Sequence, residues 1–180
     1  MEKQIRTYLK FFAMILTSMV VMFALMYLNT NEFSHVHWSQ TRFYMTFIMG
    51  AGMIVVMLLF MLDMYKSKIA NAAILILAFV MGAGALTLVR TQTPIADKSY
   101  MRAMIPHHSI AVLTSENADI RDVRVRKLAD EIIRAQRKEI KEMEWLIADI
   151  KANGIAETQS EAEARPVPDF EGQLNPEEGS

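Results

Sequence analysis

The 180-residue chain contains no cysteine. This absence excludes disulfide bonds and thiolate metal sites, so any part of the chain outside the cytoplasm must be held together by packing. A site for a soft metal ion would have to use methionine and histidine, because thioethers and imidazoles are the suitable ligands that remain. The chain has 15 methionines and 4 histidines, so it supplies both ligand types.

Charged side chains and histidine are missing from three long stretches, residues 11–28, 43–62 and 69–89. As helices, these stretches would be about 27 to 31 Å long, which matches the hydrocarbon core of a bilayer. A soluble protein would need a large surrounding domain to bury three such helices, and the remaining chain is too short for one. We therefore expect three transmembrane helices with the lipid bilayer as their partner.

The basic residues at the ends of these stretches predict the orientation, because Lys and Arg concentrate in the cytoplasmic loops of membrane proteins. They precede the first stretch and fill the turn between the second and third: Lys3, Arg6, Lys10, Lys66 and Lys68. We expect a cytoplasmic N-terminus, an inner (cytoplasmic) membrane location, and a periplasmic or extracellular C-terminal portion. The near-zero net charge gives no reason to expect a nucleic-acid partner.

The chain after the third stretch predicts a hairpin of two helices followed by a tail. Thr93-Pro94 is a typical helix start, and the first helix should run to about residue 118 with a bend or restart at Pro106. A second helix should span residues 123–152 and stop at Asn153-Gly154. The tail is acidic and poor in large apolar side chains, so we expect it to be disordered.

The predicted fold class is therefore all-α. We expect a three-span membrane domain over residues 1–90, an outside-facing two-helix hairpin over residues 91–153, and a disordered acidic tail over residues 154–180. In the membrane domain, residues 47–52 and 79–84 both read Phe-x-Met-Gly-Ala-Gly. Small residues of this kind allow close approach of helix backbones, so the second and third helices should pack closely there.

The first hairpin helix carries the strongest candidate site. Met101, Met104, His107 and His108 fall within an arc of about 120° on a helix. Thioethers and imidazoles are ligands that Cu(I) accepts readily. The competing interpretation is that the two methionines fill a core and that the histidines form its polar edge.

The second helix adds two further candidate ligands, Glu139 and Met143. Glu139 interrupts an apolar stripe beside Gln136, and a carboxylate in that position is costly unless it is paired or binds a metal. Folding the hairpin about Arg121 would place Met104 near the level of Glu139 and Met101 near that of Met143.

Two alternatives and a second candidate site stay open. Glu139 could instead form an ion pair with Arg102 or Arg134 at the edge of the seam. In the first outer loop, His35 and His37 would point the same way in an extended segment and form a candidate second metal site. They could equally anchor the loop at the membrane interface together with Trp38. We find no catalytic constellation.

Residues 100–108, which read Tyr-Met-Arg-Ala-Met-Ile-Pro-His-His, and the later Ala111, Gln136, Glu139 and Met143 resemble the family called domain of unknown function 305. The membrane part, including residues 35–42, is similar to the membrane-anchored branch of that family. The resemblance implies a ferritin-like helical fold and copper binding or copper tolerance outside the cytoplasmic membrane.

The ligands that the resemblance implies are Met101, Met104, His107, His108 and Met143. One departure is Thr114, where many members have a methionine. The absence of that thioether would lower the affinity for the metal or change which metal binds.

The sequence thus predicts a membrane-anchored protein that binds copper for buffering, delivery or tolerance. Because a hairpin is half of a four-helix bundle, we also expect homo-oligomers that cover its open face. The alternative from another class is a metal-independent membrane assembly or signalling adaptor that uses the hairpin as an interaction module.

Overall fold

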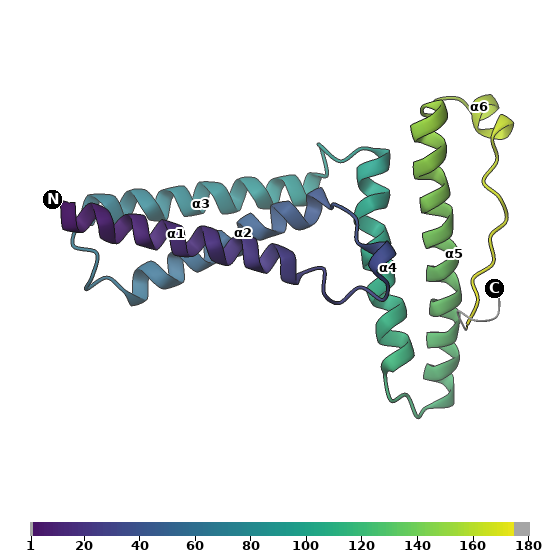
Figure 1. Ribbon diagram of the computed structural model, residues 1–180, viewed down its shortest axis with the longest axis horizontal. Helices are drawn as coiled ribbons and strands as arrows, with labels where there is room; N and C mark the ends of the chain where they lie inside the picture. Colours follow the sequence, from purple (N-terminus) through teal and green to yellow (C-terminus); the bar gives the residue numbers. More distant parts are fainter. Residues whose placement is uncertain (1, 175–180) are drawn as a thin grey trace. The chain divides into compact units, whose positions relative to one another are not determined.

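The computed structural model describes residues 2–174, and within them the regular secondary structure is all helix with no strand (Figure 1). This confirms the all-α class. The elements in chain order are α1 Glu2–Leu25, the 3-10 helix η1 Phe33–His35, α2 Gln40–Phe60, α3 Lys68–Thr91, α4 Asp97–Asn117, α5 Val123–Asn153 and α6 Gln159–Ala164.

The chain forms two compact units, which we describe separately. The apolar-helix unit comprises Met1–Leu28 and Gln40–Ile95, and the hairpin unit comprises Asn29–Ser39 and Ala96–Ser180. The division differs from the one expected from sequence, because the connection between α1 and α2 and the C-terminal tail both belong to the hairpin unit.

In the apolar-helix unit, α1, α2 and α3 are each long and apolar enough to cross a membrane. The central helix is α2, which packs against both of the others. Its fully buried Leu58 lies in a cluster with Phe11 of α1 and Ala78 of α3. Large apolar side chains also remain on the outside, including Phe60 at 89% and Phe79 at 76% exposed. Such a surface suits an apolar solvent better than water.

Small residues allow close contacts between these helices. A Cβ added at Gly82 would lie 3.0 Å from the Cβ of Ala51, which confirms the expected close approach of α2 and α3. A Cβ at Gly50 would lie 2.6 Å from the sulfur of Met19, so the same region of α2 also receives α1.

In the hairpin unit, α4 and α5 lie side by side (Figure 1). Helix α5 begins at Val123 as predicted, because the Asp122 side chain caps it by accepting a hydrogen bond of 2.8 Å from the backbone N–H of Arg124. It ends before Gly154, whose φ of 84° places it outside the helical region.

Helix α4 differs from the prediction at two positions. It begins at Asp97 and not at Thr93, because Gln92 adopts a left-handed conformation after α3 and residues 93–94 form the following turn. It also continues through Pro106 without a restart. A proline removes only its own N–H donor, and the buried contacts of α4 on both sides of Pro106 keep the helix continuous.

The tail also departs from the expectation of disorder over the residues that the structure describes. Residues 159–164 form α6, which begins with a capping box between Thr158 and Glu161. The chain then returns along α5 (Figure 1), where Lys138 forms an ion pair of 3.2 Å with Asp169. Composition alone missed this arrangement, because an acidic tail poor in apolar residues can still be held by a basic helix face. Residues 175–180 lie outside the described part of the chain.

Candidate metal centre

The candidate thioether ligands lie in the core of the hairpin unit. Met101 and Met143 are 6% and 9% exposed, and they form one buried cluster with Ile105 and Ile140. Met104 packs against the same cluster. Met101 and Met143 are therefore at the same level of the hairpin, as folding about Arg121 predicted. Three sulfur atoms thus come from two facing helices into one apolar region.

His108 is the histidine of α4 that is buried against α5. Its Nε2 lies 2.6 Å from the Oε2 of Glu139, and its Nδ1 lies 3.0 Å from the backbone oxygen of Met104. Both ring nitrogens therefore face oxygen acceptors. Metal binding at Nε2 would require the Glu139 carboxylate to move away from it.

The partner of Glu139 differs from those that the sequence suggested. Neither Arg102 nor Arg134 forms its ion pair; the partner is His108, one helical turn beyond Met104. The Glu139 side chain is 46% exposed, whereas that of His108 is 11% exposed, so this pair lies at the edge of the hairpin. Gln136 Nε2 lies 3.5 Å from the same carboxylate oxygen.

His107 has a different environment from its neighbour. It is exposed, and the centres of the His107 and His108 rings are 6.2 Å apart at an interplanar angle of 69°. Thr114, the position where a methionine was expected from the family resemblance, is also exposed, and its hydroxyl donates to the backbone oxygen of Ile110 at 3.0 Å. The shared face that the sequence predicted therefore divides into a buried part and an exposed part.

The loop before α2 contacts α4 through a buried serine that sequence reasoning missed. Ser109 is 0% exposed, and its Oγ accepts a hydrogen bond of 2.7 Å from the backbone N–H of Asn31. The same oxygen lies 3.0 Å from Nδ1 of His35. The only sign of this contact in the sequence is a serine beside the His-His pair. Serine is too common in helices for its presence to predict a contact with the loop.

His35 and His37 have different surroundings. His35 ends the 3-10 helix η1, and Val36 after it has an extended backbone. Nε2 of His37 is buried and has no hydrogen-bond partner among residues 2–174. Burial lowers the pKa of His37, against an opposing effect of Glu144, while the charges of Arg102 and His35 lower it further. These effects favour the neutral imidazole, which is the form that binds metals.

Within the described part of the chain, no three or more His, Asp or Glu side chains are grouped so that they could hold a metal ion. A metal centre built from these residues therefore has to include thioethers. Such a ligand set fits Cu(I) and does not fit a hard cation such as magnesium.

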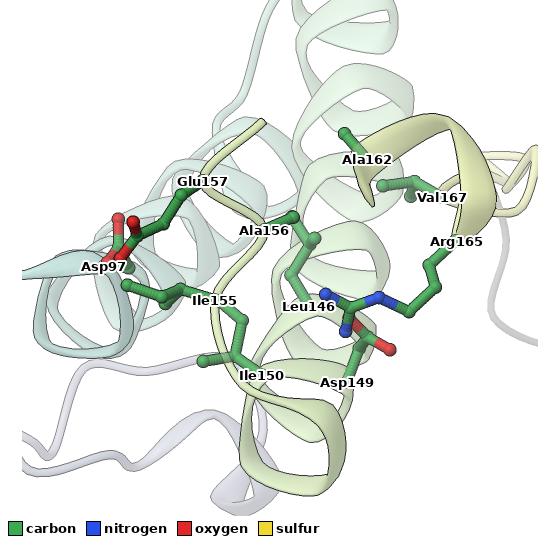
Figure 2. A pocket seen from close by; sticks show the side chains of 10 residues that line it. All are labelled: Asp97, Leu146, Asp149, Ile150, Ile155, Ala156, Glu157, Ala162, Arg165 and Val167. Carbon is green, nitrogen blue, oxygen red and sulfur yellow. The ribbon is translucent and has the colours of Figure 1, made fainter. Parts of the chain in front are cut away.

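A separate pocket of about 410 Å³ lies near the C-terminal end of α5 (Figure 2). Leu146 and Ile150 of α5 face Ile155 and Val167 of the tail across it. At its edge, Arg165 donates a hydrogen bond of 2.7 Å to Asp149. None of the predicted metal ligands lines this pocket. Because apolar side chains of the tail form part of its wall, the tail covers apolar side chains of α5.

The architecture and these residues define a class: a small all-helical protein with three apolar helices and a hairpin whose core is rich in methionine. The family described as "Domain of unknown function (DUF305)" matches residues 80–176, more than half of the chain, and the chain belongs to this family. The match includes the tail as well as the hairpin.

One relative shows that the similarity extends beyond that domain. An uncharacterized protein of Acanthamoeba polyphaga mimivirus is 32% identical over 149 residues, which cover 77% of this chain and 94% of that protein. This coverage exceeds the 80–176 match, so the similarity includes part of the apolar-helix unit. No solved structure matches the chain.

Proposed function

We propose that this protein is a membrane-anchored copper-binding protein whose hairpin unit binds Cu(I), or Cu(II) through its histidines, for buffering, delivery or tolerance. The observation that carries the proposal is the convergence of three methionines: Met101 and Met143 lie in one buried cluster, and Met104 packs against it. The further candidate ligands lie on the same two helices: His107, His108 and Glu139. The loop histidines His35 and His37 belong to the same unit.

The proposed location is outside the cytoplasmic membrane. In support, α1, α2 and α3 are apolar enough to span a bilayer, and basic residues precede α1 and occupy the turn between α2 and α3. This arrangement would put the N-terminus in the cytoplasm and the hairpin unit on the opposite side. An oxidising compartment of that kind is compatible with a soft site made without cysteine.

We also propose that the hairpin units of two or more copies associate. A two-helix hairpin leaves one side of its helices uncovered, and four helices are the usual complete bundle. Apolar side chains remain exposed near the start of α5, where Val125 is 48% and Leu128 is 56% exposed. A second hairpin would cover them.

The test is a Cu(I) titration of the full-length protein in lipid nanodiscs, with a chromophoric Cu(I) chelator as competitor. Met101→Leu combined with Met143→Leu removes two sulfur atoms at nearly constant volume, so the fold should be kept. We expect the double variant to lose the tightest Cu(I) equivalent. The matched control is Met45→Leu with Met49→Leu, two exposed methionines of α2, which should retain it.

The second candidate function is a metal-independent assembly or signalling adaptor. The observation that favours it is the His108–Glu139 pair, which satisfies both side chains without a metal. The two functions are separated by measuring the mass of the protein in nanodiscs with and without Cu(I). Oligomers that form equally well in both conditions, from a protein with no saturable Cu(I) binding, would establish the adaptor.

A further inference from the structure

The imidazole of His37 has an unusual environment for a polar group. Its Nε2 is buried, and no hydrogen-bond partner for it exists among residues 2–174. A buried polar atom of this kind costs free energy unless something binds it, and native proteins contain few of them. His35 and His108, the two buried histidines, both have close polar neighbours.

The charges that act on His37 locate it within the hairpin unit. They come from Arg102 of α4 and Glu144 of α5, in addition to His35 of the loop. Arg102 directly follows Met101 and Glu144 directly follows Met143, and these two methionines are buried in one cluster. The rise of an α-helix is about 1.5 Å per residue, so the charges that act on His37 come from the same helical turns as the two thioethers.

We propose that the buried Nε2 of His37 is the imidazole ligand of a Cu(I) centre whose sulfur ligands are Met101 and Met143. This rests on the proposed copper-binding function and identifies its histidine. One imidazole and two thioethers form a soft, uncharged ligand set, which suits a singly charged soft cation in an apolar region.

The hydrogen bonds of the other histidines explain why His37 is the preferred ligand. A metal at Nε2 of His108 would displace its contact with Glu139, and a metal at Nδ1 would displace its contact with the Met104 carbonyl. His35 would lose the contact of Nδ1 with Ser109 if it bound through that atom. Binding at Nε2 of His37 breaks no hydrogen bond and gives a buried polar atom a partner, so it costs less than binding at His108 or at Nδ1 of His35.

This assignment gives the connection between α1 and α2 a role in the metal centre. The segment is held on α4 by the hydrogen bond from Asn31 to Ser109, six residues before His37. The copper centre would therefore need three segments that are distant in sequence: the loop, α4 and α5. The hairpin alone would lack one ligand.

The experiment compares Cu(I) affinity in full-length protein in nanodiscs for the wild type, His37→Ala and His37→Met. We expect His37→Ala to weaken Cu(I) binding at least about tenfold, the smallest loss typical even for an outer-shell partner of a metal site. His37→Met supplies a different soft donor and should restore most of the affinity. Phe33→Ala, at a 98% exposed position in the same loop, is the matched control and should bind as the wild type does.

X-ray absorption of the bound Cu(I) provides a readout that a merely structural role of His37 would not change. His37→Ala should remove the nitrogen contribution and keep the sulfur contribution. A wild-type protein that binds no Cu(I) would overturn the proposed function and this assignment together. Wild-type affinity in His37→Ala, or a nitrogen contribution that persists in it, would overturn the assignment and leave copper binding by the hairpin intact.

Discussion

The apolar-helix unit and the hairpin unit are both made of packed helices, but different interactions hold those helices together. In the first unit, the contacts are apolar and include close approaches at Gly50 and Gly82. In the second, a small apolar cluster is surrounded by ion pairs such as Arg137–Glu116 and Arg165–Asp149. Lipid is as apolar as a leucine side chain, so helices in a bilayer gain little from hydrophobic burial against each other. The same kind of truncation should therefore have different costs in the two units.

The largest effect is expected from truncation of the hairpin core. Ile105 is 0% exposed, and Ile105→Ala should destabilise the hairpin unit by about 2–5 kcal/mol, through lost burial from water and the cavity that remains. Leu58→Ala in α2, also at 0% exposure, should cost less, because only the packing part of that loss applies in a bilayer. Both losses of stability can be measured by hydrogen exchange of the two units in the full-length protein in nanodiscs. An equal cost would show that the first unit is not in lipid.

A smaller effect is expected for the polar edge of the hairpin. A double-mutant cycle of His108→Gln and Glu139→Gln should give a coupling free energy of about 1 kcal/mol, because the carboxylate is half-exposed and screened by solvent. The control pair is Lys127–Glu131, which is more exposed on both sides and separated by 3.9 Å. Its coupling should be about 0.3 kcal/mol and should vanish at high salt. Equal coupling free energies in the two pairs would show that the His108–Glu139 contact is no stronger than an ordinary exposed ion pair.

The next prediction concerns the tail. A Cβ at Gly172 would overlap the backbone carbonyl of Arg134, so Gly172→Ala should displace the tail from α5. We expect faster amide exchange and proteolysis over residues 165–174, with a loss of about 1 kcal/mol or less from the ion pairs there. Gly84→Ala is the control, because a Cβ at that position meets nothing within 4 Å. An undisturbed tail in Gly172→Ala would contradict the close contact with Arg134.

The smallest effect is a dependence on pH at the start of α5. The hydrogen bonds that Arg124 donates from its side chain and backbone lower the pKa of Asp122 from 3.8 to about 2. Because the folded-state pKa is depressed, the stabilisation is fully present above pH 3.8 and is lost as the pH falls toward 2. Helicity and thermal melting between pH 4 and pH 2 should show a small loss. Asp122→Asn, which still caps the helix but does not titrate, should lack it; an identical profile would exclude Asp122 as the source.

Sequence reasoning worked best where a local rule was sufficient. The three apolar stretches and the start of α5 at Val123 follow from composition and from a capping side chain. The close approach near Gly82 follows from residue size. The start of α4 was predicted too early. Thr93-Pro94 is a typical helix start, but Gln92 ends α3 in a left-handed conformation and residues 93–94 form the turn that follows.

The candidate site could be predicted only in part. Helical periodicity placed Met101 and Met143 at one level, and the structure has both in the same cluster. It could not select His108 as the partner of Glu139, since a shift of one turn leaves the periodicity unchanged. Spacing in an extended segment suggested His35 and His37 as a pair, but it could not predict the contact of His35 with Ser109, which depends on tertiary folding.

By itself, the sequence determined the helical class, the three long apolar helices and the set of candidate soft ligands, because length, hydropathy and residue chemistry are local properties. Only the tertiary structure decided which of these candidates come together. The environment of His37 depends on Arg102 and Glu144, which are far from it in the chain, and the tail is held by the basic face of α5. Such contacts are set by the relative free energies of alternative packings, which no single segment encodes.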